Sequence, residues 1–233
     1  RSRTLSSVIR FQFAKGPEVQ FLSHLDLVRT MERALRRAGL PIAYSEGFTP
    51  RPIMSFSYAL PVGILSEAEY GDYTFAEALA PEEFVARYNQ HLPTGFRVLQ
   101  AECLPSGTPT LQRVINAARW RIVLPATSLE AERIAKRWEE LQLVDSFKVQ
   151  RETKKGSREV DLRPLLFEVV QISQTPTATT FECLCAVGSE NLRMDELGSL
   201  LGFSHLEALI TRIGQYHKVG NSYVPPVGNR GSE

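Results

Sequence analysis

The chain has 233 residues, of which 43% are hydrophobic and 23% are charged, a composition typical of a globular protein with one large or two small domains. Its formal net charge of +1 gives no overall electrostatic reason to expect a nucleic-acid-binding protein, so such an argument has to rest on local clusters. No apolar run approaches the roughly 20 residues of a membrane-spanning helix and no signal-like segment stands at the start, so we expect no membrane contact.

The cysteines predict free thiols in place of a disulfide framework. The chain has three cysteines, Cys103, Cys183 and Cys185, and an odd number in a long chain argues against a set of disulfides. Cys183 and Cys185 lie in an apolar run, which favours their burial. Free thiols are typical of a reducing compartment, so we expect a cytoplasmic protein. Position 1 is Arg and not Met, which fits a processed piece of a longer protein.

The first hundred residues predict a ferredoxin-like unit. Alternating hydrophobic residues favour a strand over residues 8–14. A helix follows, with Ser23 as its N-cap, Asp26 completing a carboxylate variant of the capping box, and Gly39 at its end. Leu25, Val28, Met31 and Leu35 form its expected apolar stripe. Extended segments are expected over residues 42–45 and 53–59 and strands over residues 69–75 and 96–102, and a second helix begins at Pro81. The order β-α-β-β-α-β predicts a split βαβ unit over residues 1–104.

A second, diverged unit is expected after a Pro- and Gly-rich linker over residues 105–112. It takes residues 113–217 and precedes a flexible tail over residues 218–233. Its expected elements are a strand over 117–124, a helix from a Thr127–Glu130 capping box to about Leu141, a hairpin around Thr153–Gly156, a strand pair around 174–176, and short helices over 194–201 and 205–216. The predicted fold class is therefore α+β, a tandem of two ferredoxin-like units with antiparallel sheets.

The first helix carries an arginine-rich face next to a lone histidine. Arg29, Arg33, Arg36 and Arg37 lie largely off the apolar stripe, with Glu32 as the acidic residue among them. Such a strip favours an anion-binding surface, and a solvated face with a Glu32–Arg36 pair is the alternative. His24, in the first turn, could tie the helix start to residues 47–52 by hydrogen bonds, or could act as a general acid or base.

Two other segments are candidate binding sites. Gly47, Pro50 and Pro52 stiffen a loop that displays Phe48 and Arg51, which suits flat ligands such as bases; burial of Phe48 in the core is the alternative. The expected hairpin and its flank carry the basic residues Lys154, Lys155, Arg158 and Arg163. These side chains could contact phosphate, or could simply be solvated.

The sequence has no metal or cofactor motif. It lacks H-E-x-x-H, G-x-G-x-x-G, a Walker loop and the C-x3-C-x2-C run of a radical-SAM core, and its other histidines lack metal-ligand spacing. We therefore expect no metal and no cofactor in this chain, and His24 is its one candidate catalytic residue.

The first unit contains a long motif that resembles the radical-SAM-linked protein family, a domain of unknown function: FLSHLDLVRTMERALRRAGLPIAYSEGFTPRPIMSFSYALPVGILSEAEYGD. The matching positions are Ser23, His24, Asp26, Arg29, Glu32, Arg33, Arg36, Arg37, Tyr44, Gly47, Phe48, Pro50, Pro52 and Glu69. The family's T-K-K-G and D-x-R-P segments match residues 153–156 and 161–164, whereas Arg51 stands where the family often has histidine. The resemblance implies a fused or separate radical-SAM partner that holds an iron-sulfur cluster, S-adenosylmethionine and cobalamin.

These observations predict a non-catalytic module that binds a substrate or partner, with RNA as a candidate ligand, and works with a radical-SAM enzyme. The alternative is a metal-independent endoribonuclease-like enzyme. In that version His24 is the general acid or base and Arg29 or Arg51 stabilises the phosphorane charge. This alternative rests on fold analogy with the CRISPR repeat-processing endoribonucleases.

Overall fold

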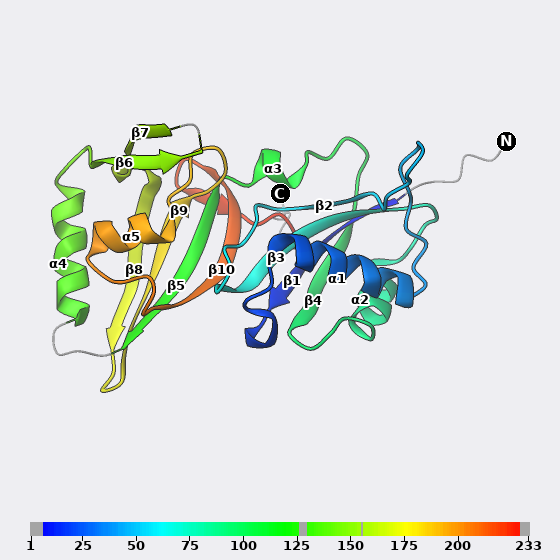
Figure 1. Cartoon of the computed structure of the whole chain (residues 1–233), viewed down its shortest axis with the longest axis horizontal. Helices are drawn as coiled ribbons and strands as arrows, with labels where there is room; N and C mark the ends of the chain where they lie inside the picture. The colour runs from blue at the N-terminus through cyan, green and yellow to red at the C-terminus, as the bar shows by residue number, and fades with distance from the viewer. Residues whose placement is uncertain (1–6, 126–129, 155, 229–233) are drawn as a thin grey trace. The chain divides into compact units, whose positions relative to one another are not determined.

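The computed structural model describes residues 7–125, 130–154 and 156–228 (Figure 1). They divide into two compact units: the first takes the chain up to Asn116 and again from Gly214, and the second takes residues 117–213. Both units combine helices with mostly antiparallel strands, so the expected α+β class is confirmed.

The observed unit boundaries differ from the expected ones near the end of the chain. We expected the second unit to run to residue 217 and a flexible tail to follow it. The chain instead rejoins the first unit at Gly214, and β11 (Ser222–Val224) pairs antiparallel with the end of β10 (Leu209–Val219). Residues of the expected tail therefore belong to a sheet.

The helix expected over residues 205–216 is wrong, because β10 occupies most of that segment. Ile210, Arg212 and Gly214 are buried at every second position, which is the period of a strand. The β-branched side chains of Ile210, Thr211 and Ile213 also favour an extended backbone.

The first unit is built on a sheet with β1 between β4 and β3. Its strands are β1 (Ser7–Lys15), β2 (Met54–Phe56), β3 (Leu65–Phe75) and β4 (Phe96–Leu104), and β2 pairs with β3. All of these pairs are antiparallel. Its helices are the 3-10 turn η1 (Pro17–Val19), α1 (His24–Arg37), α2 (Pro81–Asn89) and the short α3 (Leu111–Val114), and α1 and α2 cover one face of the sheet (Figure 1).

Aromatic side chains fill the core between this sheet and the two helices. Ile9, Phe11 and Phe13 are at most 1% exposed, which confirms the face expected from their alternation. The Phe11 ring centroid lies 4.6 Å from that of Tyr73 and 5.2 Å from that of Phe84, in tilted and edge-on contacts that aromatic pairs prefer. Burying these rings removes apolar surface from water, and the free energy gained in this way holds α2 on the sheet.

Two buried tyrosines meet inside this core. The hydroxyl oxygens of Tyr73 and Tyr88 lie 3.1 Å apart, and the Tyr88 hydroxyl donates to the Met31 carbonyl at 2.8 Å. Burial raises the pKa of both tyrosines well above the ordinary value, so both remain neutral. The contact satisfies the polar ends of both side chains and ties α2 to α1.

Helix α1 begins as its sequence predicts. The Ser23 hydroxyl oxygen accepts a hydrogen bond from the Asp26 amide at 3.2 Å, and Asp26 Oδ2 accepts one from the Ser23 hydroxyl at 2.8 Å. Leu27, Met31 and Leu35 are buried, but Leu25 is 58% exposed and lies outside the apolar stripe in which we placed it. Leu25 precedes Leu27 by two residues, which corresponds to a rotation of about 200° around the helix, so the two side chains leave the helix on opposite sides.

Ser23→Ala should lower the free energy of unfolding by about 1 kcal/mol, because an orphan amide in the first turn of α1 loses its acceptor. Urea unfolding of the variant measures this loss. Ser23→Asp, which restores an acceptor at the N-cap, should recover most of it. Equal loss in both variants would contradict the capping role.

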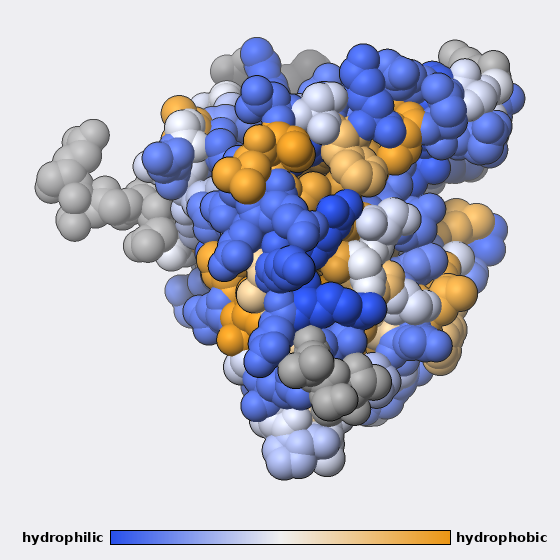
Figure 2. Space-filling view, turned by 90° about the vertical axis from the view of Figure 1, so that its left-hand side faces the viewer, coloured by the Kyte–Doolittle hydropathy of each residue, from blue (hydrophilic) through white to orange (hydrophobic). Residues whose placement is uncertain are grey.

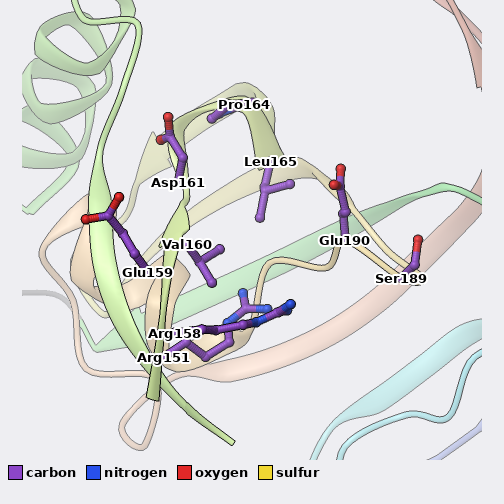
Figure 3. A pocket seen from close by; sticks show the side chains of 9 residues that line it. All are labelled: Arg151, Arg158, Glu159, Val160, Asp161, Pro164, Leu165, Ser189 and Glu190. Atoms are coloured by element: carbon purple, nitrogen blue, oxygen red, sulfur yellow. The ribbon is translucent and has the colours of Figure 1, made fainter. Parts of the chain in front are cut away.

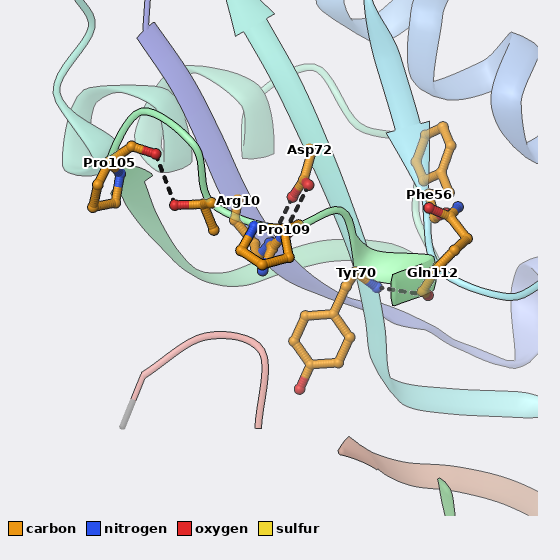
Figure 4. A network of polar contacts seen from close by, with 9 residues as sticks. Arg10, Phe56, Tyr70, Asp72, Pro105, Pro109 and Gln112 are labelled. Carbon is orange, nitrogen blue, oxygen red and sulfur yellow. Dashed lines mark hydrogen bonds and ion pairs between the residues drawn. The ribbon is translucent and has the colours of Figure 1, made fainter. Parts of the chain in front are cut away.

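The expected linker over residues 105–112 is anchored to the sheet of the first unit (Figure 4). Arg10, whose side chain is 4% exposed, binds both carboxylate oxygens of Asp72 at 2.8 Å. Nη2 of Arg10 also donates to the Pro109 carbonyl at 2.8 Å, and the side-chain Nε2 of Gln112 donates to the Phe56 carbonyl. These bonds fix the path by which the chain leaves the first unit.

The second unit has a sheet in which β9 lies between β5 and β8, with antiparallel pairing on both sides. Its elements are β5 (Ala117–Pro125), α4 (Glu130–Gln142), the hairpin of β6 (Lys148–Thr153) and β7 (Gly156–Asp161), the 3-10 turn η2 (Arg163–Leu165), β8 (Leu166–Gln174), β9 (Ala178–Ala186) and α5 (Met194–Leu201). The predicted hairpin is confirmed as a separate two-stranded sheet. Thr127 of the predicted capping box lies outside the described residues.

The outer side of α4 is hydrophilic. Ile134 and Leu141 are buried toward the unit, while Glu132, Arg133 and Lys136 are exposed. Figure 2, which shows the side on which α4 lies, is dominated by hydrophilic residues with smaller hydrophobic groups among them. This is the division expected of an amphipathic surface helix.

In β9, Cys183 and Cys185 are fully buried, and burial raises the pKa of both thiols, which keeps them protonated.

Candidate functional site

Two of the α1 arginines face acidic residues on their own helix. Arg36 forms an ion pair with Glu32, four residues before it. Arg29 Nη1 lies 3.8 Å from Asp26 Oδ1. Both arginines are exposed, and ion pairs of this kind add only about 0.2–0.5 kcal/mol to a helix. They nevertheless offset part of the positive charge that the sequence places on this face.

The other two arginines of the face bind uncharged oxygens. Arg33 Nη2 donates to the Thr30 hydroxyl at 3.1 Å, and Arg37 Nη2 donates to the His91 carbonyl at 2.8 Å. Their positive charges are therefore not offset by these contacts. The helix face is partly neutralised at Arg29 and Arg36 and remains basic at Arg33 and Arg37.

His24 is exposed at the start of α1 and contacts an aromatic ring. Its ring centroid lies 6.1 Å from that of Phe56, at an interplanar angle of 90°. The hydrogen bonds expected from His24 to residues 47–52 are not found among the described residues. The same residues place no second proton-transfer group in hydrogen-bond contact with His24. An exposed side chain has its hydrogen bonds satisfied by water, so nothing forces it toward the loop.

The loop after α1 is a hairpin-like arm held by backbone hydrogen bonds, and we call residues 43–53 the arm. The Ser45 amide donates to the Arg51 carbonyl at 2.8 Å, the Ile53 amide donates to the Ala43 carbonyl at 2.9 Å, and the Arg51 amide donates to the Ser45 hydroxyl at 3.1 Å. Gly47 near the tip has φ +127°, a conformation that glycine adopts without strain.

Phe48 at the tip of the arm points into solvent. Phe48 is fully exposed, which excludes the alternative of a Phe48 buried in the core. Arg51 is also exposed, on the returning side of the arm. The arm therefore presents an aromatic ring and a guanidinium group to the surroundings.

In the second unit, the basic residues of the predicted phosphate contact lie in different environments. Lys154 is exposed at the hairpin turn, and Lys155 lies outside the described residues. Arg163 serves the fold: Nε donates to the Leu141 carbonyl at 2.6 Å, Nη1 donates to the Leu166 carbonyl at 2.8 Å, and the guanidinium lies 5.2 Å from the Trp138 ring centroid. These contacts join the end of α4 to β8 and occupy the side chain that was predicted to bind phosphate.

Arg158 lines a cavity of about 320 Å³ in the second unit (Figure 3). The walls come from the hairpin, from η2 and from the loop after β9. The lining residues are Arg151, Arg158, Glu159, Val160, Asp161, Pro164, Leu165, Ser189 and Glu190.

Arg151 of the cavity wall forms a buried ion pair with Glu196. Arg151 Nε and Nη2 each lie 2.6 Å from a carboxylate oxygen of Glu196 in α5, and Arg151 Nη2 also donates to the Asn191 carbonyl at 2.8 Å. The two side chains are 3% and 10% exposed. Glu196 Oε2 also accepts from the Arg193 amide at 2.9 Å, so the carboxylate caps α5 and anchors the hairpin at once.

Sequence reasoning missed Arg151, Glu196, Ser189 and Glu190 as site residues. Arg151 and Glu196 are 45 residues apart, and their pairing leaves no local pattern. A signal for Glu196 was present in its position three residues after the α5 N-cap, but that spacing indicates only a helix start.

Asp161 at the end of β7 is held by backbone donors. Its Oδ1 accepts from the Phe147 amide at 2.8 Å and from the Arg163 amide at 3.1 Å. The bond from Phe147 is the main cause that lowers the pKa of Asp161 below its ordinary value. The carboxylate therefore stays ionised at the cavity wall at neutral pH.

Asp161→Asn should destabilise the protein at neutral pH, and the difference from wild type should shrink in acid. A carboxyl whose pKa is lowered by folding stabilises the native state above its unfolded pKa, and this contribution is lost as pH falls through the folded pKa. Urea unfolding of both proteins between pH 7 and pH 3 measures the difference. A difference that grows as pH falls would contradict the assignment.

The described residues contain no group of three or more His, Cys, Asp or Glu side chains that could hold a metal ion. Within the same residues, no helix is long and apolar enough to span a membrane.

Comparisons with known proteins place the chain in a family. A family model described as an uncharacterized protein conserved in bacteria (DUF2344) matches residues 8–194. Among solved structures, a similar chain is that of an unknown protein from Galdieria sulphuraria, with 10% identity over 79% of this chain and 84% of that chain and a TM-score of 0.26. The comparison with curated proteins finds no match. Because the family model spans well over half of its length, the chain belongs to the DUF2344 family of uncharacterized proteins conserved in bacteria.

Proposed function

We propose that this chain is a non-catalytic binding module that holds RNA for a radical-SAM enzyme. The observation that carries the proposal is the fully exposed Phe48 at the tip of the hydrogen-bonded arm. Burying a phenylalanine side chain is worth roughly 1.5–3 kcal/mol, so a ring held in water by a rigid loop is available for a partner.

The arm suits a flat ligand. Bases of single-stranded RNA stack on aromatic side chains, and an exposed arginine nearby can contact phosphate. Because backbone hydrogen bonds already hold the arm, little conformational entropy is lost when a base stacks on Phe48. The basic residues Arg33 and Arg37 on α1 add sequence-independent attraction to phosphate.

We also propose that the two units form a tandem of ferredoxin-like folds with a diverged second member. In the first unit the third strand, β3, lies between β1 and β2, the arrangement of a split βαβ unit. In the second unit β9 lies in the same way between β5 and β8, with the hairpin β6–β7 inserted after α4. The inserted hairpin is the divergence.

The radical-SAM link rests on the motif from Phe21 to Asp72. The chain lacks the C-x3-C-x2-C run whose three cysteines bind the iron-sulfur cluster. A fused or separate partner would therefore supply the cluster, S-adenosylmethionine and cobalamin. A cysteine triad upstream in the full reading frame, or in a protein that co-purifies with this one, is the observation that tests the link.

Filter binding of labelled cellular RNA at low and moderate salt tests the RNA proposal. Wild type should retain RNA with an affinity that falls steeply with salt, because phosphate contacts release counterions. Phe48→Ala should weaken retention about tenfold, the effect of losing one stacked base. Arg51→Ala should lower the salt dependence.

Phe21→Ala is the matched control, since Phe21 is an exposed phenylalanine of the same unit outside the arm. It should retain RNA as wild type does. Retention without salt dependence, or equal retention by Phe48→Ala and wild type, would refute RNA as the ligand of the arm.

A further inference from the structure

The cavity of the second unit brings two guanidinium groups together. Arg151 and Arg158 are directly opposite each other in the β6–β7 register, so their side chains leave the hairpin on the same face. Figure 3 shows the two side chains next to each other at one end of the cavity. Like charges in such a position destabilise a hairpin unless an anion offsets them.

Among the described residues, only one of these two charges has an acidic partner. Glu196 binds Arg151 through Nε and Nη2, which leaves the N–H groups of Nη1 for a ligand in the cavity that Arg151 lines. Arg158 has no ion-pair partner among the described residues. The arginine end of the cavity therefore carries one uncompensated positive charge and unused guanidinium donors.

The remaining walls limit what can fill the cavity. Val160 and Leu165 provide apolar surface on the cavity wall, and the loop after β9 contributes Glu190 (Figure 3). Glu159 pairs with Lys148 at 2.9 Å, and Asp161 accepts backbone amides. Glu190 has no ion-pair partner in the part of the chain that the structure describes, so it is the carboxylate left for a ligand.

We propose that this cavity binds a small molecule with a carboxylate or phosphate group at one end and an ammonium group at the other. The oxyanion would lie between Arg151 and Arg158, whose planar guanidinium groups bind such oxygens through paired hydrogen bonds. The ammonium group would lie against Glu190. A volume of about 320 Å³ is at the lower end of the range of small-molecule sites, which fits a ligand of this size.

Isothermal titration calorimetry with four probes tests the proposal, at constant ionic strength maintained with chloride. Inorganic phosphate and acetate supply the bare oxyanions, and phosphoethanolamine and β-alanine supply the same groups with an ammonium. Wild type should bind at least one oxyanion class, which identifies phosphate or carboxylate as the natural group. The ammonium-bearing member of that class should bind more tightly than the bare anion.

Arg158→Gln should weaken binding of that probe about tenfold or more, because charge-assisted hydrogen bonds are lost. Arg158 is exposed, so the variant should fold normally, and Lys154→Gln removes an equal charge from the hairpin outside the cavity as a control. Glu190→Gln should remove the advantage of the ammonium group. No binding of any probe, binding unchanged by Arg158→Gln, or an equal loss in Lys154→Gln would overturn the proposal. RNA retention through Phe48 is measured separately, so the two proposals can fail independently.

Discussion

Glu196→Ala should lower the free energy of unfolding by about 3–5 kcal/mol, the largest effect that we expect from a polar substitution in this chain. The side chain of Arg151 is 3% exposed, and removing its partner leaves a buried guanidinium without a counter-charge. The same change also removes the acceptor of the Arg193 amide at the start of α5. Urea unfolding followed by circular dichroism measures the loss.

Lys148→Ala is the matched control for this substitution. It breaks the Lys148–Glu159 pair of the same hairpin, in which both side chains are more than half exposed. Exposed ion pairs contribute little because water and salt screen them, so this variant should unfold almost as wild type does. A similar loss of unfolding free energy in both variants would show that the buried Arg151–Glu196 pair contributes no more to stability than an exposed pair.

Phe11→Ala should cost about 3–5 kcal/mol, the range for removing a buried phenylalanine. The Phe11 ring is 0% exposed and contacts Tyr73 and Phe84, so its loss leaves a cavity between the sheet and α2. Neighbouring rings are large and fixed by their own contacts, which limits collapse into the space. Thermal and urea unfolding of the variant measure the effect.

Phe21→Ala provides the comparison, because it removes the same side chain at a position that is 75% exposed. It should change stability by no more than about 0.5 kcal/mol. A Phe11→Ala variant as stable as Phe21→Ala would contradict the position of Phe11 in the core.

Elements with local signals could be predicted. Helix α1 follows from Ser23, Asp26 and the spacing of Met31 and Leu35, all within a few turns of one another. Strand β1 follows from alternating Ile9, Phe11 and Phe13. The error at Leu25 arose because a stripe read from hydrophobic residues alone cannot tell which of two neighbouring leucines faces the sheet.

The candidate sites were predicted less completely. The arm could be recognised from Gly47, Pro50 and Pro52, but its sequence allowed Phe48 to be either buried or exposed. Hydrophobicity favours burial of a phenylalanine in general, but the hydrogen bonds of the arm join its two sides and leave Phe48 exposed at the tip. Arg163 was predicted to bind phosphate because the sequence shows its charge. The sequence does not show that the carbonyls of Leu141 and Leu166 accept hydrogen bonds from this side chain.

Local sequence patterns predict the α+β class, the capped helix α1, the hairpin β6–β7 and the long motif of the first unit, because each depends on residues close together in the chain. Only the folded chain shows that Arg151 meets Glu196 across 45 residues and that Arg158 lines a cavity. A buried contact depends on which distant segment fills the space beside a side chain, and local periodicity carries no information about that segment.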